Sequence, residues 1–153
     1  MDFTLAAHVQ NIVERTRQFV DEVVAPLEQQ VIQEQRTVSL SEVTDLRAQA
    51  QAEGLWAPTM PKALGGMGLN IAEFAPILEA AGRSLLGPLA LHCAAPDEGN
   101  MHMLHTYADE EQTERYLRPL VAGEIFSAFS MTEPPPGAGS DPTMLQTTAV
   151  KEG

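Results

Sequence analysis

Residues 126–141, "FSAFSMTEPPPGAGSD", differ in character from the helix-forming chain before them and carry residue types that could bind a ligand. An apolar, aromatic run is followed by three prolines, by glycines at 137 and 139, and by Ser140 and Asp141. Because glycine has no Cβ, a turn of this kind lets backbone N–H groups approach an anion closely. Backbone groups can hold a small anion whatever the net charge of the protein.

A second candidate for chemistry is the group of His92, Cys93, His102 and His105. Zinc requires four converging ligands, and the spacing of these residues matches no usual zinc site. A Glu-x-x-His motif, which would indicate a di-iron centre, is absent as well. We therefore expect these histidines to pack between helices, and we predict no metal site.

Residues 64–68, "LGGMG", could be taken for a nucleotide-binding loop. A dinucleotide fingerprint needs a strand before its glycines, whereas a helix and Pro61 precede these. The interpretation that we favour is a turn that leads into a helix beginning at Asn70, so the glycines serve the fold.

Composition narrows the class of protein. The 153 residues are 44% hydrophobic, enough for one domain with a core. Nine Lys+Arg against 21 Asp+Glu give a net charge of −12, the wrong sign for neutralising nucleic acid phosphates, so we expect no nucleic acid partner. Cys93 is the only cysteine, which favours a reducing compartment, by default the cytoplasm. No signal-like or membrane-spanning run is present, so we predict a soluble protein.

Apolar residues recur at three-to-four spacing from Phe3 to about Glu34, which predicts a long amphipathic helix that Pro26 bends or splits. Ser39 with Glu42 reads as a capping box for a second helix, closed by Gly54. The remaining predicted helices run from Asn70 to about Ser84, through "PLALHCAA", through "DEGNMHMLHTYA", and from Asp109 to about Gly123.

The character of the chain changes after Gly123. Residues 125–131 form a compact apolar run and residues 143–153 alternate loosely, so both are predicted to be strands. Two strands do not make a stable sheet. The expected fold is therefore mainly α: a helical bundle over residues 1–124, followed over residues 125–153 by the first strands of an incomplete β domain.

The stretch "FSMTEPPPGAGSD" resembles the flavin-binding signature of the acyl-CoA dehydrogenase family. Upstream, "MPKALGGMGL", "AAGRS" and "DEEQTERYLRPLVAGE" are similar to further motifs of this family, in the family's order. The segment "CAAPDEGNMHML" is closest to the branch that acts on long-chain, branched or hydroxylated acyl-CoA thioesters. The resemblance implies an N-terminal helical domain plus the opening of a middle β domain.

The resemblance also implies a reaction and its partners. A carboxylate would remove the α proton of an acyl-CoA while the β hydrogen leaves as hydride to N5 of FAD, which introduces an α,β double bond. Electron-transfer flavoprotein or a similar acceptor, and a homo-oligomer, would be the partners, with the mitochondrial matrix as location in a eukaryote. The family's base comes from the C-terminal domain, so no catalytic residue is expected here and we expect this chain alone to be inactive.

Family roles carry over to four residues of the stretch. Phe129 and Met131 would cover the isoalloxazine of FAD, and Thr132 would offer its hydroxyl and N–H near N5 and O4. Ser140 would contact an FAD phosphate and bound substrate, although Pro135 and Pro136, an insertion relative to the medium-chain type, stiffen the loop before it.

Two acidic residues of the stretch have structural interpretations. Glu133 is interpreted as a loop carboxylate that hydrogen-bonds to backbone rather than as the catalytic base. Asp141 is interpreted as a turn or cap residue, because a carboxylate beside phosphate is repulsive.

Small residues along "LHCAAPDEG" match the family segment that borders the acyl cavity. Ala95 and Gly99 are predicted to contact substrate, and with Ala94 they would leave room for a long or bulky acyl group; the same small residues could instead allow close helix packing. An alternative for the whole chain is a helical interaction module that pairs with another chain and binds no flavin alone.

Overall fold

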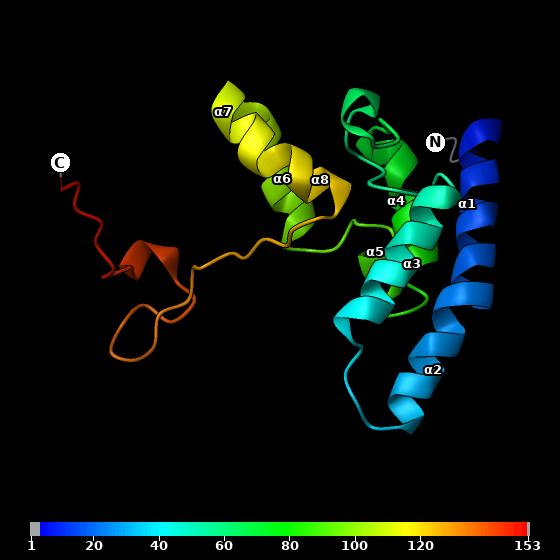
Figure 1. The fold of residues 1–153 in the computed structure, drawn as a ribbon, viewed down its shortest axis with the longest axis horizontal. Coiled ribbons are helices and arrows are strands. Elements are labelled where there is room, and N and C mark those ends of the chain that lie inside the picture. Colours follow the sequence, from blue (N-terminus) through cyan, green and yellow to red (C-terminus); the bar gives the residue numbers. More distant parts are fainter. Residues whose placement is uncertain (1–3, 153) are drawn as a thin grey trace.

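The computed structural model describes residues 4–152, and Figure 1 shows a body of helices from which residues 125–152, irregular except for one short helical turn, extend. The prediction of a mainly α chain is confirmed. In chain order the elements are α1 (Ala7–Phe19), η1 (Val20–Val24), α2 (Ala25–Gln33), α3 (Leu40–Ala52), η2 (Lys62–Leu64), α4 (Ile71–Ala81), α5 (Gly87–Ala90), α6 (Asp97–Tyr107), α7 (Glu110–Gln112), η3 (Thr113–Leu117), α8 (Arg118–Ala122) and η4 (Pro142–Met144).

The N-terminal helix is continuous but not uniform. A π-helical turn, η1, joins α1 to α2 immediately before Pro26, which occupies the first turn of α2. Proline cannot fit an undisturbed α-helical ladder, and the wider turn accommodates it. The expected start at Phe3, like Gly153 at the end of the second predicted strand, lies outside the described residues.

Side-chain caps fix where the helices begin. Ser39 opens α3 and Asn70 opens α4, each accepting a hydrogen bond from the backbone N–H three residues further on, so the predicted capping box at Ser39 and the predicted helix start at Asn70 are confirmed. Asp109 forms a third box with Gln112 at the start of α7. Gly54 follows α3 with a φ of 65°, as expected for a helix stop.

The core lies where the long N-terminal helix meets the middle of the chain. Helix α1 packs on α4, α3 packs on α5, and α6 packs on η3 and α8. The interior is filled by large apolar side chains that are fully buried, which accounts for the apolar spacing in the sequence. The largest are Leu55, Met60, Ile77, Leu91, Met101, Leu117 and Leu120.

The two predicted strands are wrong as secondary structure. Between residues 4 and 152 the chain forms no strand; residues 126–132 are irregular, and a single antiparallel bridge joins Glu133 to Gly139. The physical reason is pairing: a strand exists only against a neighbour, and residues 125–131 and 143–152 do not pair with each other.

Candidate active-site cleft

The start of α6 and the segment after α8 form the two walls of an open cleft of about 430 Å³. It is lined by Ala95, Pro96, Glu98, Gly99, Asn100, Met103 and Phe129. Ala95, Gly99 and Phe129, which the sequence singled out separately, therefore line the same cleft. A Cβ added to Gly99 would meet no atom within 4 Å, so the missing side chain leaves free space.

Local structure explains why these groups face one another. Gly99 and Met103 are four residues apart on α6 and so share one helix face. Phe129 lies on the opposite wall with 69% of its surface exposed. One wall of the cleft is therefore the face of α6 that lacks a side chain at Gly99, and the other wall is the exposed ring of Phe129.

A second hollow of about 330 Å³ adjoins the first and shares Asn100, Met103 and Phe129 with it. Large apolar side chains, among them Tyr116 and Phe126, line the remainder. A continuous exposed apolar surface of this kind marks a ligand or a partner rather than ordinary protein surface.

Asp97 ties the two walls of the cleft together. Its buried carboxylate accepts hydrogen bonds from the backbone N–H of Ser127 at 2.8 Å and from the Ser127 hydroxyl at 2.7 Å. Its other oxygen accepts one from the Arg47 guanidinium at 3.3 Å, and both side chains of that ion pair are more than 90% buried. Burial lowers the pKa of Arg47, against the opposing effect of Asp97.

Two further contacts fix the same segment. The Asn100 amide donates a hydrogen bond to the Ser127 hydroxyl oxygen at 2.9 Å. The Arg47 guanidinium lies over the Phe126 ring, 4.4 Å from its centroid, in a cation–π arrangement. Sequence reasoning missed Arg47, Asp97, Asn100 and Ser127; an Asp at a helix start followed by Asn three residues later was the available signal.

Three further predicted site residues lie outside the cleft lining. Met131 is half-buried, whereas Thr132 and Ser140 are exposed. Pro135, Pro136 and the glycine turn separate Ser140 from Thr132 along the chain. The structure therefore groups Phe129 with Ala95 and Gly99 but does not place Ser140 beside them.

Glu133 has the structural role that the sequence suggested. Its carboxylate accepts hydrogen bonds from the backbone N–H groups of Ala138 and Gln146, and from the N–H and hydroxyl of Thr147. These bonds lower the pKa of Glu133 to about 2. Asp141 likewise caps η4, accepting from the N–H and hydroxyl of Thr143, which confirms it as a cap residue.

The prediction that the histidines pack between helices is confirmed for His92 but is wrong for His102 and His105, which lie on an exposed face of α6. His92 is buried and its Nε2 donates to the Leu120 carbonyl at 2.7 Å; burial lowers the pKa of this imidazole. Exposed His102 pairs with Glu98 one helical turn away. Among residues 4–152 no three His, Cys, Asp or Glu side chains are placed to hold a metal ion.

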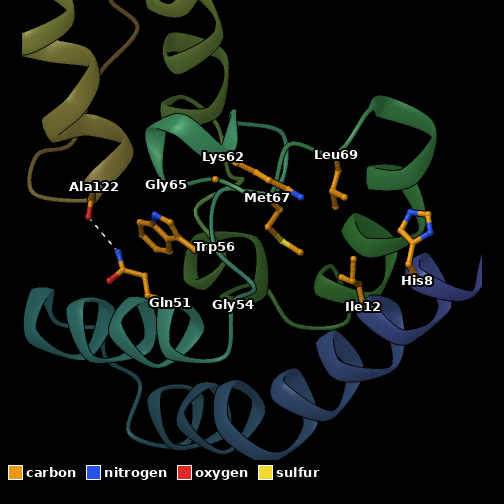
Figure 2. Close-up of a pocket in the computed structure, with 11 residues that line it drawn as sticks. His8, Ile12, Gln51, Gly54, Trp56, Lys62, Gly65, Met67, Leu69 and Ala122 are labelled. Carbon is orange, nitrogen blue, oxygen red and sulfur yellow. Dashed lines mark hydrogen bonds between the residues drawn. The ribbon is translucent and has the colours of Figure 1, made fainter.

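A larger pocket, about 680 Å³, lies elsewhere, between α1, α3 and the loop around Lys62 (Figure 2). None of the predicted site residues lines it. Two of its polar side chains are already engaged, since Gln51 donates to the Ala122 carbonyl and His8 pairs with Glu73. Gly66 belongs to its wall, and a Cβ there would lie 2.2 Å from the Met60 carbonyl, so this glycine serves the fold.

Comparison with known proteins decides the family. Residues 7–124 match the family described as "Acyl-CoA dehydrogenase, N-terminal domain". The chain belongs to the acyl-CoA dehydrogenase family.

Relatives of this family match nearly the whole chain. "Probable acyl-CoA dehydrogenase FadE2" of Mycobacterium tuberculosis is 37% identical over 160 residues, covering 100% of the chain and 38% of that relative. Mouse "Acyl-CoA dehydrogenase family member 10" is 36% identical, covering 97% of the chain and 15% of that relative. The chain thus spans well under half the length of these acyl-CoA dehydrogenases.

A solved structure agrees with the fold. A Mycobacterium abscessus protein assigned to the acyl-CoA dehydrogenases superposes with a TM-score of 0.76 at 37% identity, over 92% of the chain and 37% of that protein. Within residues 4–152 no helix combines the length and apolar character needed to cross a membrane.

Proposed function

We propose that this chain provides the N-terminal helical domain, residues 1–124, and the first flavin-facing segment, from residue 125 onward, of an FAD-dependent acyl-CoA dehydrogenase. The observation that carries the proposal is the cleft in which Ala95 and Gly99 of the helical body face Phe129 of that segment. Family membership supports the reaction class. The cleft supports the division of roles between the two parts.

The residues fit a flavin edge. Phe129 presents an exposed aromatic ring, which suits a flat heteroaromatic partner. Thr132 is exposed and its hydroxyl makes no hydrogen bond to the residues that the structure describes, so a donor is available for a polar ring edge. Preorganised donors of this kind stabilise charge that develops during reaction. Met131, half-buried beside Thr132, would add apolar cover.

The turn after the prolines suits an FAD phosphate less well than Phe129 and Thr132 suit the flavin ring. Gly139 has a φ of 59° and free space where a Cβ would be, and Ser140 exposes its hydroxyl. The Ala138 N–H is already donated to Glu133, so it is not available to an anion. Ser140 is the residue that we assign to the FAD phosphate and to bound substrate.

Bound FAD would supply the hydride acceptor for α,β-dehydrogenation. The residues of this chain would bind and orient. Ala95 and Gly99 would leave space for the acyl group, and Phe129 with Met103 would exclude water from it. The catalytic base would come from outside this chain, so the chain alone would not catalyse the dehydrogenation.

The remaining assignments follow the same proposal. The substrate would be an acyl-CoA, and electron-transfer flavoprotein or a similar protein would accept the electrons. The complete protein would be a homo-oligomer in the cytoplasm, or in the mitochondrial matrix of a eukaryote. Phe126 and Phe129 are exposed apolar residues, and we expect the rest of the protein or a partner to cover them.

The test is to purify the native-length polypeptide that carries this chain and to record its flavin absorbance before and after anaerobic addition of acyl-CoA. We expect a yellow protein whose flavin bands bleach on addition of a long-chain or branched acyl-CoA. A colourless protein that does not take up FAD and leaves acyl-CoA unchanged would instead support the interaction module.

A further inference from the structure

Asp97 lies where the helical body meets the segment that carries Phe129. The hydrogen bonds from Ser127 to its carboxylate, at 2.8 and 2.7 Å, connect the two walls of the cleft. Gly99 follows Asp97 by two residues on one wall, and Phe129 follows Ser127 by two residues on the other. The separation of these walls is therefore set within two residues of the Asp97–Ser127 contact.

We infer that Asp97 is a positioning residue which, through Ser127, fixes the width of the acyl slot between Gly99 and Phe129. This inference rests on the proposed function for its meaning in catalysis, but the anchoring itself does not. Residues 126–130 have no regular secondary structure, so no backbone ladder holds them in place. Bonds to an ionised, buried carboxylate are stronger than neutral ones and meet little competition from water.

The surroundings of Asp97 indicate an anchor rather than an isolated core ion pair. Arg47 occupies one carboxylate oxygen, which leaves the other free to accept both donors of Ser127. Asn100, three residues after Asp97 on α6, donates to the same serine hydroxyl oxygen. Arg47 also covers the ring of Phe126. Four contacts from two helices of the body thus converge on two adjacent residues of the segment.

The first variant for a test is Ser127→Ala in the native-length polypeptide. It removes the hydroxyl both as a donor to Asp97 and as an acceptor from Asn100, but keeps the serine's backbone bond and the Arg47–Asp97 pair. Ser130→Ala is the matched control, because Ser130 is an exposed serine of the same segment. Hydrogen exchange of residues 126–129, Tm, and KM and kcat for a long-chain acyl-CoA are measured on both.

We expect Ser127→Ala to keep a Tm close to that of the wild type while exchange at residues 126–129 becomes about tenfold faster, as loss of a charge-assisted hydrogen bond predicts. KM for the long-chain acyl-CoA should rise about tenfold with kcat changed less. Asp97→Asn should shift both quantities in the same direction. Ser130→Ala should leave exchange and KM at wild-type values.

Unchanged exchange and unchanged KM in folded Ser127→Ala would overturn the inference, and so would equal effects in Ser127→Ala and Ser130→Ala. If Asp97→Asn does not fold, the serine variant still decides. A wild-type polypeptide that binds no flavin would refute the proposed function and with it the slot. The exchange data would even then show separately whether Asp97 anchors the segment.

Discussion

The imidazole of His92 stacks on the indole of Trp56, with ring centroids 4.5 Å apart and ring planes 11° apart. Both rings donate to successive carbonyls in α8: Trp56 Nε1 to Val121 at 2.9 Å and His92 Nε2 to Leu120 at 2.7 Å. The last carbonyls of a helix have no partner within it. Trp56 provides the partner for the Val121 carbonyl, and His92 adds a second donor to the Leu120 carbonyl, which also accepts from the Gly123 N–H; together they fix the end of α8, from which the cleft segment departs.

Stability should therefore depend on the charge of His92. Burial lowers its pKa below the ordinary 6.5, so the unfolded chain binds this proton at a higher pH than the folded one. The stabilisation is complete above about pH 6.5 and falls as pH drops towards the folded pKa, by at most about 1.4 kcal/mol per pH unit. Urea unfolding at pH 7 and pH 5 measures it.

His92→Phe tests the assignment. Phenylalanine keeps a stacked ring but cannot titrate or donate to Leu120, so we expect lower stability at pH 7 and a weaker dependence on pH. His105→Gln, at an exposed position, is the control. If wild type and His92→Phe lost equal stability between pH 7 and pH 5, the proton would be bound elsewhere.

Removal of one member of the buried ion pair should be costly. Asp97→Ala leaves the Arg47 guanidinium buried without its carboxylate, and we expect a loss of about 3–5 kcal/mol in the free energy of unfolding. The double variant Arg47→Met with Asp97→Leu removes both charges and should recover much of that loss. Chemical denaturation of the three proteins gives the comparison; a loss below about 1 kcal/mol in Asp97→Ala would argue against an important pair.

Gly99 offers a test of the acyl slot in which stability and activity should move in opposite directions. Glycine within a helix costs about 1 kcal/mol relative to alanine, and a Cβ here meets no atom, so Gly99→Ala and Gly99→Leu should both stabilise the protein. Leucine should also narrow the slot and raise KM for a long-chain acyl-CoA about tenfold or more. Gly99→Ala is the control for the backbone effect.

A contrary result for Gly99 is easily recognised. If Gly99→Leu gained stability and kept the chain-length profile of the wild type, the small residues would serve helix packing alone. A strict preference for butyryl-CoA in the wild type would refute the roomy slot directly.

The hydrogen bonds that the Glu133 carboxylate accepts from Ala138, Gln146 and Thr147, here called the Glu133 clasp, should weaken only at low pH, because they lower the pKa of this carboxyl group. Its pKa of about 2, against an ordinary 4.5, means that the carboxylate holds Ala138 and Thr147 throughout the neutral range. The contribution is complete above about pH 4.5 and is lost as pH falls through about 2. NMR titration of the carboxyl carbon should show this low midpoint.

Glu133→Gln should release the clasp at neutral pH. The glutamine side chain has only one acceptor oxygen and no negative charge. We therefore expect faster hydrogen exchange at the backbone N–H groups of Gln146 and Thr147 than in wild type. Glu152→Gln, near the end of the described residues, is a suitable control. Equal exchange at these amides in wild type and Glu133→Gln would contradict the clasp.

The helices of this chain could be predicted from sequence because their signals are local. Apolar spacing, the capping residues Ser39 and Asn70 and the stop at Gly54 each involve neighbours within a few residues. The strands failed for the opposite reason. The apolar run around Phe129 has strand composition, but pairing depends on a partner that a local pattern does not specify.

Part of the candidate site could likewise be predicted from the sequence, and part could not. Family motifs singled out Ala95, Gly99 and Phe129, and the structure places them in one cleft. The network of Arg47, Asp97 and Ser127 joins residues 30 and 50 positions apart, so no sequence window contains it. Long-range hydrogen bonds between single polar residues leave almost no periodic signal.

The most direct test of the proposed flavin site is a crystal structure of the native-length polypeptide with FAD and a long-chain acyl-CoA analogue. We predict the isoalloxazine in contact with Phe129 and hydrogen-bonded to Thr132, with the acyl chain running past Gly99. A flavin bound elsewhere, with Thr132 turned away from it and the Gly99 cleft filled by protein side chains, would contradict the proposal.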